Sequence, residues 1–363
     1  MKFECISEYL IITVEQVAKA RSKSSTAAYL QDVYISLDDH QLTLRATNLE
    51  MTCEKSISVK GIHNGSVLIK GDILVKTVQA FKNKKTPLTC EVIEGVFVIA
   101  SGNDVIEIKT TPQEDFPTLP HTGEELVTLP QDTFSTLIRE VMFCAATTEI
   151  KPEIASVYLY NDKEVLTAVA TDSYRLAEKK IHTENIPTVN LLIPQKYITD
   201  ILSILESEEG DLTLSYQTGI LTFTKNNLTL SVHSLTGQFP DYRQLFPKEC
   251  TTTVVLSKEE LTKALTVTSL FTENYSPLSC QIDGTTLTLQ TKSESLGKAT
   301  QTLEVTLTGE PISVYYNNRY FLDVIPHIEG NQMKMEFTTP NRPVVITSMN
   351  NTSFTYLLMP VNR

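Results

Sequence analysis

Two segments of this 363-residue chain repeat each other's landmarks at a nearly constant spacing, which constrains the fold more than any other feature. The landmark pairs are Leu10 and Phe134, Thr47 and Thr171, and Val67 and Leu191, each 124 residues apart, and Phe116 and Phe239, 123 residues apart. A spacing held across separate landmarks indicates two copies of one fold. The first 250 residues therefore predict two tandem domains of like structure.

A third, fainter copy follows. SKEELTKALTV predicts an opening helix from Ser257, and ISVYYNNRYFLDVI repeats the passage from a strand into a helix. Asn317 lies 123 residues after Pro194, the corresponding position of the second copy. We therefore expect domains at residues 1–125, 126–250 and 251–363.

Each copy has the pattern of two amphipathic helices and several alternating strands. VYISLDDHQLTLRATN alternates like a hairpin with its turn at Asp38-Asp39. The second helix of the first copy is predicted from Asp72, as N-cap, to near Asn83. Its predicted apolar face is Ile73, Leu74, Thr77, Val78 and Phe81. The fold class is α+β, with two helices on antiparallel sheet in each domain, and sheet edges that could close a ring.

Composition limits where the chain could act. The net charge of −12 argues against binding nucleic acid over the whole surface, so any DNA contact must be local. No run approaches the roughly 18 apolar residues of a membrane span, and no signal peptide is recognisable, so a cytoplasmic location is expected. The cysteines and histidines lack zinc-ligand spacing. We expect reduced, mostly buried cysteines, no metal and no cofactor.

The sequence contains no recognisable catalytic motif. There is no phosphate-binding GxGxxG or GxxxxGK[ST] loop. A metal-dependent nuclease would need converging carboxylates, but Asp38-Asp39 suits a turn and Glu259-Glu260 suits the first turn of a helix. A non-catalytic binding protein is therefore the leading interpretation, with the nuclease as the alternative.

Several segments resemble the β sliding clamp of bacterial DNA polymerase III over essentially the full length. They are MKF, RATNLEM, AVATDSYRLA, LLIPQKYITDIL, GQFPDYRQLFP and YLLMPVNR. The chain departs from the family's usual residues at Ser173-Tyr174, in the loop at 27–30 and at Asn362. These departures bear on partner specificity rather than on the fold.

The resemblance implies a head-to-tail homodimer of three-domain subunits that encircles duplex DNA without sequence preference. Its expected partners are the replicative polymerase, the clamp loader and other proteins that carry a clamp-binding motif. A paralogue that keeps the fold without loading on DNA is a further alternative, disfavoured by FPDYR and LLMP.

The resemblance also implies three sets of site residues. The candidate DNA contacts are Lys19, Arg21, Lys23, Lys76, Lys82, Lys84, Lys85, Arg139, Lys151, Lys196, Lys263 and Arg319. An ordinary solvated helix face is the alternative for the cluster from Lys76 to Lys85. The candidate partner-peptide pocket is Ile154, Thr171, Ser173, Tyr174, Arg175, Leu176, Pro240, Gln244, Leu245, Tyr320, Leu357, Leu358, Met359, Pro360 and Val361. The candidate dimer contacts are Ile106, Ile108, Leu270 and Phe271, for which burial within the subunit is the alternative.

Overall fold

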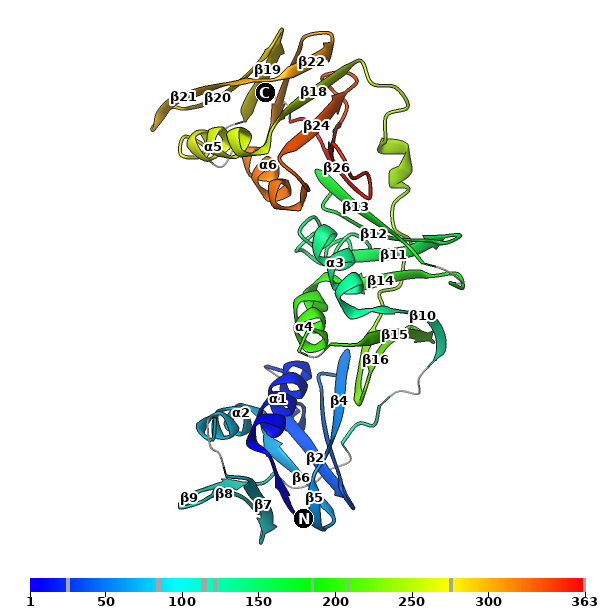
Figure 1. The fold of residues 1–363 in the computed structure, drawn as a ribbon, viewed down its shortest axis with the longest axis vertical. Helices are drawn as coiled ribbons and strands as arrows, with labels where there is room; N and C mark the ends of the chain where they lie inside the picture. The colour runs from blue at the N-terminus through cyan, green and yellow to red at the C-terminus, as the bar shows by residue number, and fades with distance from the viewer. Residues whose placement is uncertain are drawn as a thin grey trace. The chain divides into compact units, whose positions relative to one another are not determined.

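The computed structural model describes residues 1–23, 27–82, 86–111, 116–119, 123–183, 186–207, 209–273 and 277–361. The chain divides into two compact units. Unit 1 is Met1–Ser135, Asn185–Pro187 and Lys196–Leu235, and unit 2 is Thr136–Glu184, Thr188–Gln195 and Thr236–Arg363. Figure 1 labels the elements along the chain. None of the described helices is long and apolar enough to cross a membrane.

Unit 1 contains two antiparallel sheets in its described residues. The five-stranded sheet has the order β5 (Lys60–His63), β1 (Lys2–Cys5), β7 (Leu88–Ile93), β8 (Val96–Ser101) and β9 (Asp104–Lys109). The eight-stranded sheet has the order β10 (Glu124–Pro130), β15 (Asp211–Gln217), β16 (Ile220–Lys225), β17 (Leu228–His233), β4 (Met51–Ser58), β3 (Gln41–Thr47), β2 (Asp32–Asp38) and β6 (Gly65–Lys70). The pairing of β17 with β4 joins strands of the first and second repeats.

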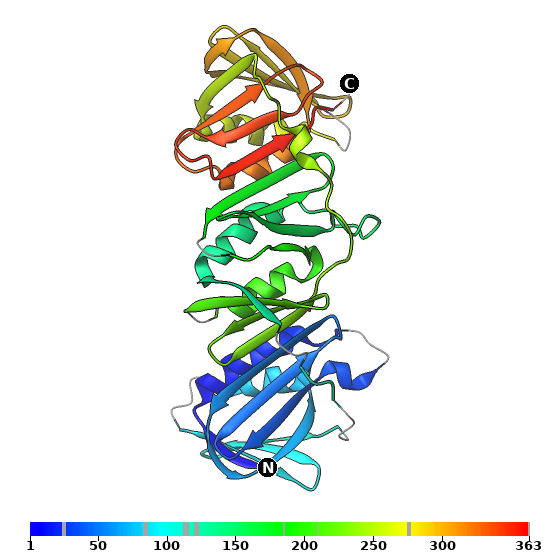
Figure 2. The same cartoon turned by 90° about the vertical axis from the view of Figure 1, so that its right-hand side faces the viewer.

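Unit 2 repeats this plan. Its nine-stranded sheet has the order β14 (Asn190–Pro194), β11 (Ser156–Asp162), β12 (Val165–Thr171), β13 (Arg175–His182), β26 (Phe354–Leu358), β25 (Val344–Ser348), β24 (Gln332–Phe337), β18 (Thr252–Ser257) and β22 (Thr306–Gly309). Its four-stranded sheet has the order β21 (Gly297–Glu304), β20 (Thr286–Ser293), β19 (Leu278–Asp283) and β23 (Ile312–Tyr316). Figure 2 shows red β26 beside green β13, where strands of the second and third repeats pair.

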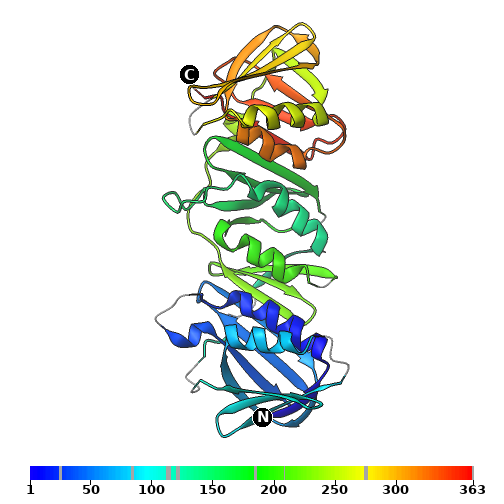
Figure 3. The ribbon, with the colours of Figure 1, turned by 90° about the vertical axis from the view of Figure 1, so that its left-hand side faces the viewer.

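The helices cover the sheets in pairs. In unit 1, α1 (Ser7–Val17) packs beside α2 (Gly71–Ala80), and in unit 2, α5 (Lys258–Ser269) packs beside α6 (Asn318–Val324) (Figure 3). The second repeat supplies α3 (Gln131–Met142) and α4 (Gln195–Leu205). The predicted inward residues Phe134, Leu137, Ile138 and Val141 of α3 are buried. These helices form because apolar side chains recur at helical spacing and so bury one face.

Local signals place several element ends. Helix α5 begins at the predicted position, and the side chain of Ser257 caps it by accepting a hydrogen bond from the Glu260 backbone N–H. The β2–β3 hairpin is confirmed, but its turn lies at Asp39-His40, one residue later than predicted, because Asp38 still pairs with Gln41 in the ladder. Five of the six cysteines are buried, and Cys250 is exposed.

The prediction for the second helix of the first repeat was wrong at its ends and on one face residue. Helix α2 follows β6 directly, with Lys70 as N-cap, and stops at Ala80. Asp72 lies in the first turn and forms an ion pair with Arg21 instead of capping the helix. Ile73, expected inside, is 46% exposed.

Candidate functional site

A tight turn between β12 and β13 forms the centre of the predicted peptide pocket. The Thr171 hydroxyl donates to the Arg175 carbonyl oxygen at 2.7 Å and accepts from the Ser173 backbone N–H at 3.1 Å. The Asp172 carboxylate accepts from the backbone N–H groups of Tyr174 and Arg175 at 2.9 and 3.0 Å. Ser173 takes a positive φ of 78°. Side chains that bond their own turn hold this loop in one conformation and present Tyr174, which is 60% exposed, to solvent.

The first repeat contains the same turn between β3 and β4. The Thr47 hydroxyl donates to the Met51 carbonyl oxygen, and Leu49 has a φ of 75°. The Asn48 side chain accepts from the N–H groups of Glu50 and Met51, as Asp172 does in the second repeat. The position of Arg175 is taken by buried Met51, so the arginine distinguishes the second turn from the first.

Arg175 is held by two carboxylates and two aromatic rings. Its Nε lies 2.9 Å from Asp172 Oδ2 and its Nη1 lies 2.5 Å from Asp323 Oδ2 on α6. The guanidinium carbon lies 4.4 Å from the ring centre of Tyr320 and 5.6 Å from that of Phe143. Burial is the largest single influence and disfavours the charge of Arg175, but its hydrogen bonds to Asp323 and Asp172 and its interactions with neighbouring groups together outweigh burial and raise its pKa. Its planar donor fork is therefore fixed in place.

The predicted pocket residues lie on both faces of the sheet around this turn. Neighbouring strand residues point to opposite faces, and directly paired residues share one. Thr171 pairs with Leu176, and Leu176 pairs with Leu357, so these three share a face. Arg175 pairs with Leu358, and both lie on the opposite face. The predicted set therefore surrounds the end of the β12–β13 hairpin.

Two residues after β26 form backbone hydrogen bonds, Met359 with this turn and Val361 with β23. The Met359 N–H donates to the Tyr174 carbonyl oxygen at 2.9 Å, and the Val361 N–H donates to the Tyr315 carbonyl oxygen at 2.8 Å. Pro360 lies between them, half-buried. The structure thus brings Tyr174 and Met359 together, as the pocket prediction requires.

The remaining predicted residues lie in two other segments. Ile154 is buried in the loop before β11. Pro240, Gln244 and Leu245 belong to the connector, defined as residues 236–251 before β18, and Leu245 is 39% exposed. Gln244 and Leu245 lie in the short helix η3 (Tyr242–Leu245). Their link to the sheet runs through Tyr242, which was not among the predicted residues.

Sequence reasoning also missed Asp172, Asp323 and Phe143, which surround Arg175. Asp172 had a usable signal, because Thr-Asp before a two-residue turn matches Thr47-Asn48 in the first repeat. Asp323 and Phe143 had none, since only tertiary packing brings them to Arg175.

Substitution of Arg175 tests how much this ion-pair cluster stabilises unit 2. Arg175→Ala leaves two part-buried carboxylates without their cation and should lower the free energy of unfolding by about 2–3 kcal/mol. Arg175→Lys restores the charge but not the fork and should recover part of that loss. Urea denaturation measures both, with exposed Arg319→Ala as the control at no more than about 0.5 kcal/mol. Equal losses for Arg175→Ala and Arg319→Ala would contradict this role.

Several of the candidate DNA contacts form ion pairs or hydrogen bonds within the subunit. Lys196 pairs with Glu50 at 2.8 Å, Lys263 pairs with Glu259 at 2.6 Å, and Arg21 pairs with Asp72. Lys19 donates to the Ser203 carbonyl oxygen at 3.2 Å. The exposed remainder is Lys23, Lys76, Lys82, Arg139, Lys151 and Arg319. Lys84 and Lys85 lie outside the described residues.

Two of the candidate dimer contacts lie on an edge strand of unit 1, and the other two lie at the C-terminal end of a helix of unit 2. Ile106 and Ile108 belong to β9, an edge strand of the five-stranded sheet, and Ile108 is 4% exposed while Ile106 is half-buried. Leu270, the C-cap residue of α5, is 69% exposed, and Phe271 is half-buried beside Gly297. Ile108 therefore already belongs to the core of unit 1, and Leu270 is the most solvent-exposed of the four.

Metal ligands do not converge in the described part of the chain. No group of three or more histidine, cysteine, aspartate or glutamate side chains there could hold a metal ion. The charged clusters that do occur pair acids with bases, as around Arg175.

Three domain profiles match the chain in order. They describe the DNA polymerase III beta subunit: its N-terminal domain matches residues 1–120, its central domain 128–241 and its C-terminal domain 243–362. The beta sliding clamps of Bacillus subtilis and Streptomyces coelicolor are 26% and 24% identical to this chain, and each comparison covers 99% of both chains.

Solved structures show the same fold. The DNA polymerase III beta subunit of Thermotoga maritima superposes with a TM-score of 0.93 at 23% identity, covering 100% of this chain and 99% of that one. The DNA polymerase III subunit beta of Pseudomonas aeruginosa gives 0.94 at 21% identity and covers both chains fully. With all three domain profiles matched in order along nearly the whole sequence, this chain belongs to the DNA polymerase III beta subunit family.

Proposed function

We propose that this protein is a DNA sliding clamp, a non-catalytic processivity factor that encircles duplex DNA and tethers the replicative polymerase. The observation that carries the proposal is the ordered match of all three clamp domains to residues 1–120, 128–241 and 243–362. The domain boundaries proposed with this role are 1–125, 126–250 and 251–363. The proposed role requires neither a metal nor a cofactor. Because a bacterial chromosome lies in the cytoplasm, we also propose a cytoplasmic location.

The proposed ring is a head-to-tail homodimer in which the third domain of one subunit meets the first domain of the other. Edge strands support this arrangement, because β9 and β21 each end a sheet and present backbone donors and acceptors for pairing. Exposed Leu270 and Val105 supply apolar surface at the same ends of their units. A closed ring would bury both edges.

Partner proteins would dock a short peptide motif in the pocket around Arg175. Leu176 and Leu357 supply aliphatic surface, Met359 adapts to varied side chains, and Tyr174 and Arg175 supply polar groups at the edge. Pro240, Gln244 and Leu245 of the connector complete the proposed site. This chemistry favours peptides with leucine and phenylalanine anchors, from the polymerase, the clamp loader and other DNA-processing proteins.

DNA contact through scattered lysines should be weak and salt-dependent. Replacing Lys76, Lys82, Lys84 and Lys85 by serine should shorten residence on DNA severalfold at low salt, because screening at higher salt already weakens such contacts. Single-molecule residence times measure this. Serine at Lys60, Lys163, Lys248 and Lys292, which lie on strands and loops, makes the same charge change and should have little effect. Equal residence for both variants would identify the first cluster as an ordinary solvated helix face.

Topological linkage tests the proposed function as a whole. Protein loaded with its clamp loader on nicked circular DNA should remain bound through gel filtration and be released when the circle is cut. Protein that stays on linear DNA, or that turns over labelled DNA with Mg²⁺ or Mn²⁺, would overturn the sliding-clamp proposal. The second result would instead favour the nuclease.

A further inference from the structure

The connector is tied to the sheet by a continuous chain of hydrogen bonds. Strand register places Tyr160, Thr167 and Lys180 in one cross-strand row and Tyr158, Val169 and Glu178 in the next, all on one face. Leu176 lies on that same face of β13, two residues from Glu178. The hydrogen-bonded residues and the Leu176 side of the proposed peptide pocket therefore share one face of the sheet.

Each bond in the chain has a defined direction. Tyr242 Oη donates to Glu178 Oε2 at 2.5 Å, which uses its only proton. Tyr160 must therefore donate to Tyr242 across the 2.6 Å between their hydroxyl oxygens. Arg243 Nη2 donates to Tyr160 Oη at 3.2 Å, and Lys180 Nζ lies 2.5 Å from Glu178 Oε1. Bonds aligned in this way strengthen one another.

Burial makes this chain costly to break. Tyr242 and Glu178 are each 4% exposed, and Tyr160 is 8% exposed. Burial and the neighbouring carboxylate raise the pKa of Tyr242, so its hydroxyl remains a donor. Loss of this donor leaves a buried carboxylate short of one hydrogen bond, which costs free energy.

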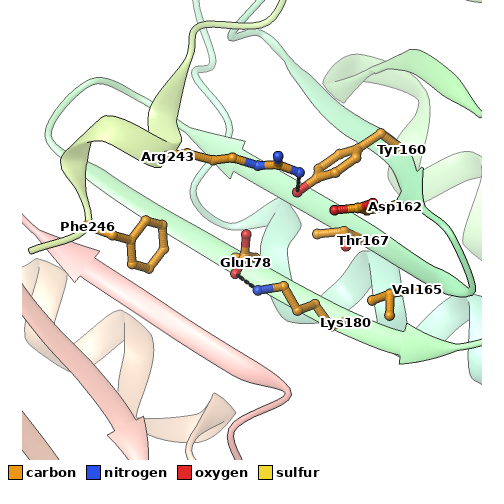
Figure 4. Close-up of a pocket in the computed structure, with 8 residues that line it drawn as sticks. All are labelled: Tyr160, Asp162, Val165, Thr167, Glu178, Lys180, Arg243 and Phe246. Atoms are coloured by element: carbon orange, nitrogen blue, oxygen red, sulfur yellow. Dashed lines mark hydrogen bonds and ion pairs between the residues drawn. The ribbon is translucent and has the colours of Figure 1, made fainter. Parts of the chain in front are cut away.

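Aromatic rings also hold the connector against the sheet, but side chains do not fill all the space around these contacts. Phe239 stacks on Tyr158 with ring centres 4.9 Å apart, and Tyr242 meets Phe246 edge-on at 6.1 Å. A cavity of about 440 Å³ lies beside these hydrogen bonds. Figure 4 shows Glu178 and Lys180 between Phe246 on one side and Thr167 and Val165 on the other. Because this space is not filled by side chains, the hydrogen bonds carry more of the attachment than they would in a dense core.

Tyr242 sits among the connector residues of the proposed pocket. Pro240 lies two residues before it, and its carbonyl oxygen accepts the Tyr242 backbone N–H at 2.8 Å. Gln244 and Leu245 follow in the same short helix, η3. Anchoring Tyr242 therefore restricts the positions of all three.

We propose that Tyr242 and Glu178 are positioning residues for partner binding, which hold the connector so that Pro240, Gln244 and Leu245 are set for the incoming peptide. The inference rests on the proposed function and adds that the pocket is competent only while this bond is made. A connector that spends part of its time detached would lower the apparent affinity by the fraction of time it is attached.

Binding of a fluorescein-labelled peptide with leucine and phenylalanine anchors tests this, by anisotropy on the full-length protein. Tyr242→Phe keeps the ring and removes the bond to a charged acceptor, so affinity should fall about five- to tenfold. Glu178→Ala should act similarly, and Glu178→Gln, whose amide oxygen still accepts from Tyr242, should restore much of the loss. Tyr158→Phe is the matched control, because no hydrogen bond of its hydroxyl is found within the described residues, and it should bind like wild type.

Hydrogen exchange separates positioning from a general loss of structure. In Tyr242→Phe, amides of residues 236–247 should exchange faster while those of β11 to β13 stay protected. Wild-type affinity in Tyr242→Phe, with or without faster exchange, overturns the inference. Loss of protection throughout unit 2 also overturns it, since the role would then be structural. A wild-type protein that binds no peptide contradicts the proposed function itself and removes the basis of this inference.

Discussion

Aspartate at both Leu270 and Phe271 should convert the proposed dimer into monomers, with the dimer dissociation constant raised at least about a thousandfold. Leu270 is 69% exposed at the end of α5, so a negative charge introduced at this position would stay in water in a monomer and cost little. At a junction with β9 of a second copy, the same charges would be buried without a partner, at a cost of several kcal/mol for each junction. A head-to-tail ring has two such junctions, so the penalty doubles.

Sedimentation velocity at micromolar concentration measures the result. Ile150→Asp is the matched control, because Ile150 is an 86% exposed apolar residue in a loop outside the proposed junction. It should leave the dimer intact. Unchanged circular dichroism would establish that the double variant folds, and a folded double variant that still sediments as a dimer would remove these residues from the interface.

Deletion of Met359 through Arg363 should abolish binding of a leucine- and phenylalanine-containing clamp motif. An intact pocket should bind such a peptide at about micromolar affinity, near −8 kcal/mol. Each buried apolar anchor contributes roughly 1.5–3 kcal/mol, so loss of the Met359 wall and of its bond to Tyr174 should weaken binding at least about a hundredfold. Leu358 still pairs with Arg175, so the nine-stranded sheet should remain.

A shorter deletion separates the pocket from the chain end. Removing only Asn362 and Arg363 keeps Met359, Pro360 and Val361 and should leave peptide affinity within about twofold. Both proteins should sediment as dimers. Full peptide binding by the five-residue deletion would refute the pocket assignment, and equal loss in both would move the important contact to the last two residues.

Local pattern was enough to predict the elements that depend on neighbours in sequence. The 124-residue repeat located matching helices and strands, and apolar spacing correctly placed Phe134, Leu137, Ile138 and Val141 inside. The start of α5 at Ser257 was predicted correctly, and the hydrogen bond that caps it, from the Glu260 N–H, spans only three residues. The error at α2 arose where local signals conflicted: Asp72 has the chemistry of a cap but pairs with Arg21, and Ile73 beside it is turned outward.

The sequence by itself determined three tandem domains and most of their helix faces, and its family resemblance predicted a site at Thr171 to Leu176 and the last residues. Only the tertiary structure decided that β13 pairs with β26 and β4 with β17, which joins the repeats into continuous sheets within each unit. It also brought Asp323 to Arg175 across 148 residues and Tyr242 to Glu178 across 64. Helix periodicity and capping depend on neighbours a few residues apart, whereas these contacts depend on sheet register and on chain segments whose separation leaves no local signal.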